Sequence, residues 1–286
     1  MSDSGDTGDA TGSEDAADPV AVAADSDVVE AAVGDRADGV ATVTISRPDE
    51  RNALNAAVRE DLADVLAAAE ADPSSRVVVL TGDDAGGAFV SGADVTELRE
   101  RDALEQREAS KRPRIYERVA DLSLPVIARI NGHALGGGCE LALACDVRLA
   151  AEDAKLGQPE ISLGIIPGGG GTQRLPRLVG EGQAMRLILS GELIDAAEAG
   201  DIGLVDEVLE EESLDERVDE LAGAMADKSP VALEFAKDAV RASGRMDLDD
   251  GLAYEAALFA QLFATDDKNE GIDAFLEGRD PDWHGE

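Results

Sequence analysis

The sequence predicts an α/β fold that ends in a helical region. Between about residues 39 and 150, short β-branched runs alternate with helical patterns, and this rhythm is typical of largely parallel strands joined by helices. From about residue 213 onward, helical patterns follow one another with no strand pattern between them. The chain has 286 residues, 44% of them hydrophobic, which is enough for one large domain with a sizeable core.

Each element follows from a local pattern. The first strand alternates β-branched residues and stops before Pro48, and the first helix carries apolar residues such as Leu62 and Leu66 at helical spacing. The expected strands are 40–45, 77–80, 126–130 and 147–150. The expected helices are 55–71, one around 95–122, 137–144, 214–226, 230–243, 247–265 and 268–278.

Three regions are expected along the chain. Residues 1–34 are rich in Asp, Ala, Gly and Ser and contain no Lys or Arg, so they bury too little apolar surface to offset the entropy of ordering. We therefore expect a disordered acidic tail over 1–37, a core that holds the site over 38–212, and a C-terminal helical region over 213–286.

Charge and composition exclude several classes of function. The 62 acidic residues outnumber the 25 basic ones, for a net charge of −37, and such a surface repels nucleic acid and anionic membranes. No apolar run reaches 18 residues, no secretory signal opens the sequence, and the two cysteines are too few for a disulfide scaffold or a zinc cluster. These features favour a cytoplasmic protein. Salt at about 1 M shortens the Debye length to roughly 3 Å, so the excess charge also favours a halophilic host.

Two stretches contain groups that can do chemistry. Gly136 to Gly138 precede a helical run that carries Glu140 in its first turn. Glycines allow a close backbone approach, and a helix N-terminus presents free N–H groups with partial positive charge, so this turn could stabilise a negative charge. A glycine turn that serves only strand-to-helix packing explains the same pattern equally well.

Glu160 follows Pro159 and precedes a second glycine cluster, 168–171. Taken alone, Glu160 is better explained as a first-turn glutamate that suits the helix dipole, with Pro159 at the first helical position. The glycines do not form a phosphate-binding loop, because no Gly-Lys-Ser/Thr follows them, and neither cluster has the G-x-G-x-x-G spacing.

The order and separation of three stretches carry a resemblance to a known family. They are Ser91–Asp94 after Phe89, NGHALGGGCELALACD at 131–146, and GQPEISLGIIPGGGGTQRL at 157–175. The segments ISRPDERNALN at 45–55 and FATDDKNEGIDAFLEGRDPDW at 263–283 add to it. Over about residues 38–285 the chain resembles the crotonase, or enoyl-CoA hydratase/isomerase, family. The resemblance implies a crotonase (ClpP-like) spiral of ββα units, followed by a C-terminal helical region that mediates trimerisation.

The resemblance also implies the site residues. The oxyanion hole would be the backbone N–H groups of Ala93 and Gly137, and the catalytic pair would be Glu140, which activates water, and Glu160, which supplies the α-proton. Residues expected to contact the substrate or its CoA moiety are Arg51, Ala53, Leu54, Ser91, Gly92, Asp94, Gly136 and Gly168. The segment 164–172 would line the acyl end.

These residues imply an enoyl-CoA hydratase that converts trans-2-enoyl-CoA to 3-hydroxyacyl-CoA, as in β-oxidation. CoA would be part of the substrate, with no metal and no separate cofactor. The expected partners are the acyl-CoA thioester and further copies of the chain, as a trimer or a dimer of trimers, without nucleic acid or membrane. The alternatives are a double-bond isomerase or another acyl-CoA lyase of the same family, and a non-catalytic or RNA-binding relative. The sequence does not indicate the acyl chain that is preferred.

Overall fold

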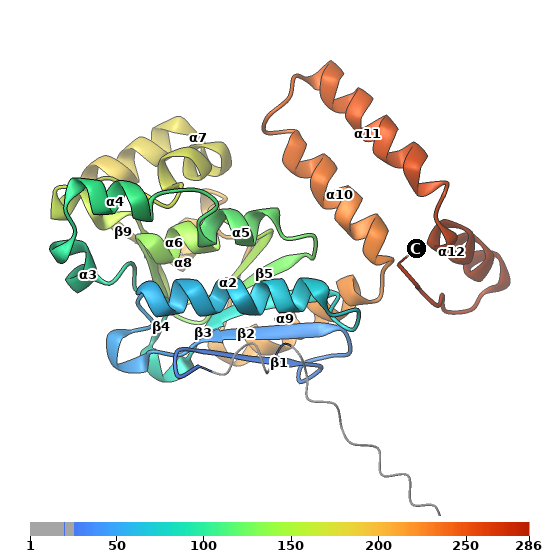
Figure 1. Ribbon diagram of the computed structural model, residues 1–286, viewed down its shortest axis with the longest axis horizontal. Coiled ribbons are helices and arrows are strands. Elements are labelled where there is room, and N and C mark those ends of the chain that lie inside the picture. Colours follow the sequence, from blue (N-terminus) through green and yellow to red (C-terminus); the bar gives the residue numbers. More distant parts are fainter. Residues whose placement is uncertain (1–19, 21–25, 286) are drawn as a thin grey trace, which may run out of the picture.

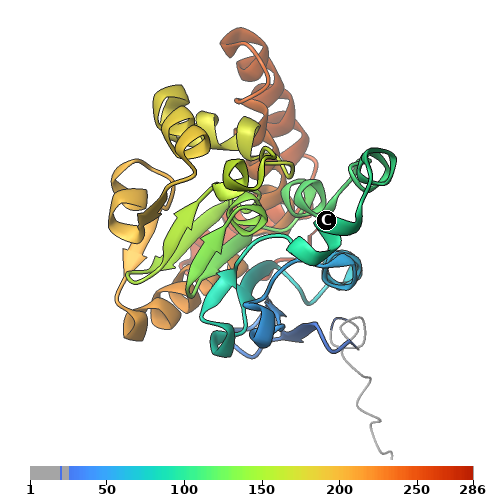
Figure 2. The same cartoon turned by 90° about the vertical axis from the view of Figure 1, so that its left-hand side faces the viewer.

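The computed structural model describes residue 20 and residues 26–285. The chain folds into two sheets that are surrounded by helices (Figures 1 and 2). The strands are β1 Val29–Val33, β2 Val40–Ile45, β3 Val77–Gly82, β4 Ala88–Val90, β5 Val126–Ile130, β6 His133–Leu135, β7 Val147–Ala151, β8 Lys155–Gly157, β9 Leu193–Asp195 and β10 Glu207–Leu209. The α-helices are α2 Ala56–Ala71, α3 Val95–Glu100, α4 Ala103–Ala109, α5 Ile115–Asp121, α6 Gly137–Ala142, α7 Gly171–Ser190, α8 Ala196–Asp201, α9 Glu211–Ala226, α10 Pro230–Ala242, α11 Leu248–Leu262 and α12 Asp266–Glu277. Short 3-10 helices cover η1 Pro48–Glu50, η2 Asp84–Gly86 and η3 Pro159–Leu163.

Successive strands are shared between the two sheets. The large sheet has the order β1-β2-β3-β5-β7-β10 and is parallel except for β1, while the small sheet has the order β4-β6-β8-β9 and is parallel except for β9. Each of β3, β5 and β7 is followed by a strand of the small sheet and then by one or more helices. This is the ββα repeat that the resemblance implies, and it brings the ends of β4, β6 and β8 side by side.

Side chains of β3 alternate between two cores, as the two-residue period of a strand requires. Val78 and Leu80 pack in the larger core, which includes the apolar face of α2. Val77 and Val79 pack in a second core with Leu214 and other residues of α9. The large sheet is therefore covered on both faces, which explains why its strands read as continuous apolar runs.

The structure corrects the expected N-terminal boundary. Residues 29–33 were expected in a disordered tail, yet they form β1 and pair antiparallel with β2 along its whole length. Val29 is fully buried, so this short apolar run supplies the contacts that its acidic surroundings do not suggest. Within the expected tail, residues 1–19 and 21–25 lie outside the described residues.

The single helix expected around 95–122 is also wrong. Three short helices take its place, α3, α4 and α5, each with its own N-cap, and Asp94 and Asp102 accept backbone N–H groups at the first two. Asp and Pro residues within the pattern end one helix and begin the next. The other predicted strands and helices match the structure to within a few residues.

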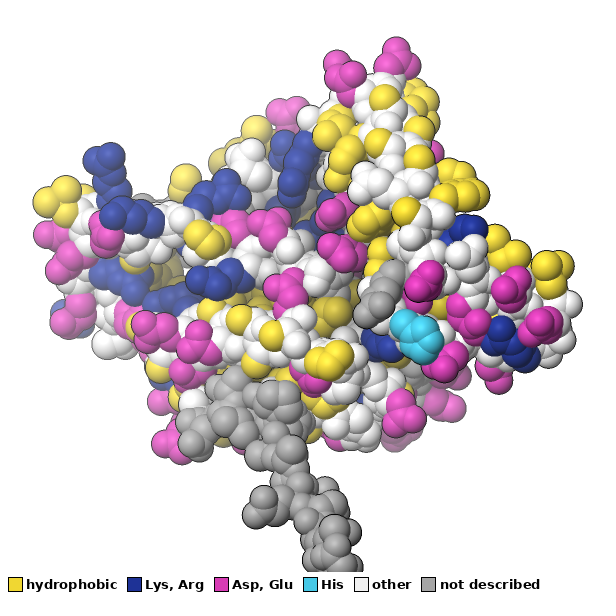
Figure 3. Space-filling view, turned by 45° about the vertical axis from the view of Figure 1, so that its right-hand side comes forward, with side chains coloured by type: hydrophobic (Ala, Val, Ile, Leu, Met, Phe, Trp, Pro, Cys, Tyr) yellow, Lys and Arg dark blue, Asp and Glu magenta, His cyan; other side chains and the backbone are white. Residues whose placement is uncertain are grey.

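The helices α10, α11 and α12 lie to one side of the sheets (Figure 1), whereas α9 packs against the large sheet. Lys237 and Arg241 of α10 form ion pairs with Asp146, at 2.8 and 2.6 Å. Large apolar side chains of these helices stay exposed, including Phe259 and Phe263, and Figure 3 shows hydrophobic side chains gathered along them. None of the described helices is long and apolar enough to cross a membrane.

Candidate active site

The loop Ser91–Asp94 is held against the segment 51–54. The Leu54 N–H donates to the carbonyl of Gly92 at 2.8 Å, and the Asp94 N–H donates to the carbonyl of Leu54 at 2.9 Å. In such a parallel bridge the residue between these two bonds directs its own N–H to the opposite side. That residue is Ala93, so its N–H points away from the segment 51–54.

The segment 51–54 keeps its shape through Asn52. Arg51 and Asn52 both have left-handed backbone conformations, with φ of 51° and 58°. The buried Asn52 amide donates to the carbonyls of Asp83 and Ala88, which offsets the strain of that turn. The carbonyl of Arg51 accepts the Ser91 N–H, while the Leu54 side chain lies wholly in the core. Leu54 can therefore serve a ligand only through its backbone.

The glycine triplet leads from β6 into α6, and two of its members need to be glycine. Gly136 has a φ of 50°, which favours glycine. A Cβ on Gly138 would lie 1.9 Å from the carbonyl oxygen of Val90, and a Cβ on Gly137 would lie 3.3 Å from the Ala93 nitrogen. Gly137 is the first residue of α6, so its N–H has no partner inside the helix. The residues predicted as oxyanion donors, Ala93 and Gly137, therefore meet at one place.

Glu140 lies on α6 and is only 3% exposed. Its Oε1 accepts the backbone N–H groups of Gly169 and Gly171, at 2.6 and 2.8 Å. Burial raises the pKa of this carboxyl group, and the two N–H groups act against that rise. The loop that carries the second glycine cluster thus holds Glu140 in one position and supports its charged form.

Glu160 is on η3, directly after β8, with Pro159 at the first helical position. A Cβ on Gly136 would lie 3.0 Å from Glu160 Oε1, so Glu160 reaches the glycine triplet from the other side. With its amide nitrogen turned toward the carboxylate, the buried Gln158 donates to both oxygens, at 3.1 and 3.3 Å. Burial and the negative charge of Glu140 raise the pKa of Glu160 to about 7.

These groups form one constellation around α6: two backbone N–H groups at one corner and two carboxyl groups that interact electrostatically. The sequence matches the family described as enoyl-CoA hydratase/isomerase over residues 35–286. It is 47% identical to the 2,3-dehydroadipyl-CoA hydratase of Escherichia coli (strain K12), over 86% of this chain and 95% of that protein. It is 43% identical to the short-chain-enoyl-CoA hydratase of Clostridium acetobutylicum, over 84% of this chain and 92% of that one.

The chain belongs to the enoyl-CoA hydratase/isomerase family. A crystal structure of the enoyl-CoA hydratase from Bacillus anthracis superposes with a TM-score of 0.85 at 41% identity, and the match covers 90% of this chain and 99% of that one. The predicted crotonase fold is therefore confirmed. The roles predicted for single residues remain predictions, which the geometry above supports.

Four residues of this hydratase site were not found from the sequence. Gln158 binds Glu160, and Tyr116 lies beside Gly137 and Gly169. Arg174 donates to the carbonyl of Gly169 at 2.9 Å, and Arg114 donates to that of Gly168, so two arginines fix the loop that binds Glu140. Gln158 is the first residue of the Gln-Pro-Glu stretch and could have been noticed there. Tyr116 and Arg174 lie in helices, and Arg114 precedes α5, with no distinctive local pattern.

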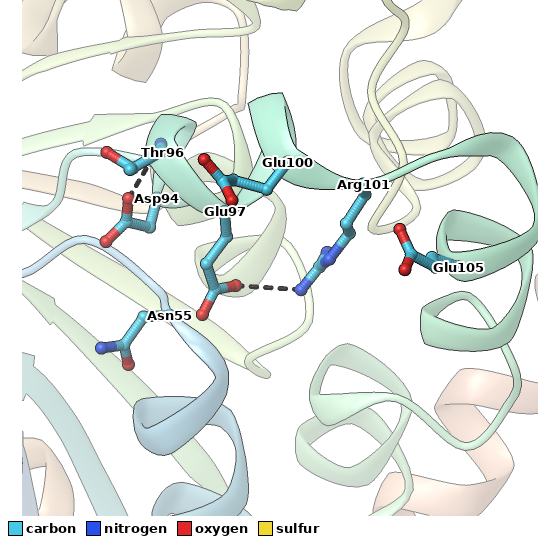
Figure 4. Close-up of a pocket in the computed structure, with 7 residues that line it drawn as sticks. All are labelled: Asn55, Asp94, Thr96, Glu97, Glu100, Arg101 and Glu105. Atoms are coloured by element: carbon cyan, nitrogen blue, oxygen red, sulfur yellow. Dashed lines mark hydrogen bonds and ion pairs between the residues drawn. The ribbon is translucent and has the colours of Figure 1, made fainter.

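A pocket of about 750 Å³ opens beside the loop 91–94, away from the catalytic pair (Figure 4). Asp94 caps α3 by accepting the Thr96 N–H at 3.0 Å, and Glu97 pairs with Arg101 at 2.9 Å. Glu100 and Glu105 add two further carboxylates to the lining. Because negative charge dominates, this pocket does not suit the phosphates of CoA, and Asp94 acts by fixing the end of the loop.

Proposed function

We propose that this protein hydrates trans-2-enoyl-CoA to 3-hydroxyacyl-CoA, with Glu140 and Glu160 as acid and base and with Ala93 and Gly137 as oxyanion donors. The chain is an enoyl-CoA hydratase, a hydro-lyase: its relatives include the two hydratases named above and, at 42% identity, the crotonyl-CoA hydratase of Syntrophomonas wolfei. The observation that carries the assignment of roles is that the Ala93 nitrogen lies 3.3 Å from the point where a Cβ on Gly137 would sit.

Hydration of a conjugated thioester moves negative charge onto the thioester oxygen. Two backbone N–H groups fixed at that oxygen stabilise the enolate-like transition state, and removal of one such donor typically costs about 3–4 kcal/mol. Ala93 is fixed by the bridge to Leu54, and Gly137 by the start of α6. Neither donor needs to move when charge develops.

The two carboxyl groups differ in a way that suits their tasks. Glu140 accepts two backbone N–H groups that favour its ionised form, which a base that activates water requires. Glu160, with its pKa raised to about 7, keeps a proton near neutral pH and can deliver it to the α-carbon. The proposal needs CoA only as part of the substrate, with no metal or other cofactor.

The exposed apolar residues of the C-terminal helices support a homo-oligomer, a trimer or a dimer of trimers. Leu248, Leu252, Phe259 and Phe263 share one face of α11 by their spacing, and each is at least half exposed. A monomer rarely keeps such a stripe in water. The net charge of −37 would oppose assembly in dilute salt, so we further propose adaptation to a salt-rich cytoplasm. It also opposes nucleic-acid binding.

The test is hydration of crotonyl-CoA in concentrated KCl by the parent protein, Glu140→Gln and Glu160→Gln. Each substitution keeps the shape of the side chain and removes its acid–base function, so we expect rates lower by about 10²–10⁴-fold. Asp84→Asn serves as the matched control, because it replaces a carboxylate with an amide on η2, outside this constellation. Two Gln variants as fast as the parent would refute the roles, and double-bond migration without 3-hydroxyacyl product would favour an isomerase.

A further inference from the structure

Tyr116 places a phenol inside the site that the proposed mechanism does not use. It lies on α5 and is 9% exposed. Its hydroxyl oxygen is 3.0 Å from the point where a Cβ on Gly137 would sit, and the Ala93 nitrogen is 3.3 Å from the same point. The hydroxyl group therefore shares one corner of the site with both oxyanion donors.

The surroundings of the ring hold it in this orientation. A Cβ on Gly169 would lie 2.5 Å from Cε2 and Cζ of Tyr116, so the ring packs directly on the backbone of the loop that binds Glu140. Arg174 donates to the carbonyl of Tyr116 at 3.3 Å, and the Arg114 guanidinium lies 5.8 Å from the ring centroid. Since Arg114 and Arg174 also bind that loop, ring and loop form one rigid unit.

The hydroxyl group is available to a ligand. Within residue 20 and residues 26–285, no hydrogen bond joins it to another group, and it is not one of the fully enclosed polar atoms that lack a partner. Part of its surface therefore stays accessible. Burial and the charge of Glu140 raise its pKa, so it keeps its proton and can donate a hydrogen bond to a substrate oxygen.

We propose that the Tyr116 hydroxyl group donates a third hydrogen bond to the thioester oxygen of the substrate, beside the N–H groups of Ala93 and Gly137. The inference rests on the hydratase function proposed above. Water activation is the other task open to a phenol here. Glu140 lies near the same ring, since its Oε2 is 2.6 Å from the point, beside Tyr116 Cζ, where a Cβ on Gly169 would sit. The carbonyl measurement described below therefore decides between the two tasks. A donor aimed at the oxygen strengthens as the enolate forms, and it therefore acts mainly on kcat.

The test is Tyr116→Phe, which removes only the hydroxyl group. Tyr254→Phe on α11 makes the same chemical change in the other tyrosine of the chain, far from the ring and its loop. Two quantities are measured: the kinetics of crotonyl-CoA hydration, and the infrared C=O stretch of bound butanoyl-CoA labelled with ¹³C at its carbonyl. Butanoyl-CoA has no double bond to hydrate, so its carbonyl reports polarisation alone.

We expect Tyr116→Phe to lower kcat by about 10²-fold with little change in KM, and to move the C=O stretch back toward its position in free solution. Tyr254→Phe should match the parent in both measurements. An unchanged C=O stretch in Tyr116→Phe would overturn the inference, whatever the rate, because the phenol would then not touch the carbonyl. If the parent hydrates crotonyl-CoA and only the stretch fails to move, the proposed function stands and this inference falls. A parent without hydratase activity would overturn both.

Discussion

The core of the molecule and its C-terminal helices use apolar residues in opposite ways. The sheets, α2 and α9 bury their large apolar side chains within the chain, and many of these residues have no exposed surface at all. In α10, α11 and α12, only Ala242, Leu258 and Ala274 are buried among the apolar residues, while Phe275 is 85% exposed. The core buries its apolar side chains within the chain, whereas these three helices leave most of theirs exposed.

This difference separates the positioning of the site from its assembly. Every group of the catalytic constellation lies between residues 51 and 174, on helices of the core and on the loops that join its elements. The C-terminal helices reach the core through polar anchors such as Lys237, which pairs with Asp146 and donates to the carbonyl of Leu124. Changes in the core should therefore affect chemistry and folding, and changes in the helices should affect association first.

The largest effect is expected from a pair of matched glycine substitutions. In Gly138→Ala the new Cβ would lie 1.9 Å from the Val90 carbonyl oxygen, so β4 and α6 must separate. We expect the free energy of unfolding to fall by about 3 kcal/mol and the hydration rate to fall by more than about 10²-fold. In Gly251→Ala on α11 the Cβ would meet nothing within 4 Å, and alanine should stabilise the helix by about 0.5–1 kcal/mol.

Denaturant unfolding and the crotonyl-CoA assay measure both variants under identical salt. Equal effects of the two substitutions would show that the core is no more tightly constrained than the helices, which would contradict the difference between them described above.

Local patterns predicted much of the core but less of the site. The runs 40–45, 77–80 and 126–130 are buried on both faces and mostly apolar because α2 and α9 cover the sheet from both sides. Such strands can be predicted from the sequence. The strands β6, β8, β9 and β10 are only three residues long, too short to show a period. Without the resemblance, Glu160 would have been taken for an ordinary first-turn glutamate.

Local patterns cannot predict contacts between segments that are distant in the sequence. Tyr116 is brought to Gly137 by the path of the chain through three short helices, and nothing near residue 116 signals that approach. The same holds for β1, whose apolar residues are ordered by pairing with β2 rather than by their own acidic surroundings.

A smaller effect is expected from Phe259→Gln on α11. Phe259 is 63% exposed and packs edge-on against Phe263, with ring centroids 5.1 Å apart. If this stripe binds a second copy of the chain, loss of one aromatic anchor should weaken association by about 10–100-fold. Ala257→Gln adds the same polar group on the same helix, outside the stripe, and should leave association unchanged.

Analytical ultracentrifugation of the parent and both variants, in roughly 2 M and roughly 0.1 M KCl, tests this expectation. Charges are strongly screened at the higher salt concentration and less so at the lower one. The parent should dissociate in the dilute salt, where its excess negative charge is least screened. A parent that sediments as a monomer in both salts would remove the assembly role of the helices.

The smallest effect is expected in how hydration kcat/KM depends on pH. Glu160 must be protonated to deliver the α-proton, and its pKa is raised to about 7 by burial and by the charge of Glu140. Hydration kcat/KM should therefore be level just below about pH 7 and fall tenfold per pH unit above it, because the acid form is lost as pH rises. Glu160→Gln has no proton to lose, so its low residual rate should not show this alkaline decline. Phe259→Gln lies outside the core and should keep the decline of the parent, with the same midpoint. A decline that persists in Glu160→Gln would assign it to another group and would remove Glu160 as the acid.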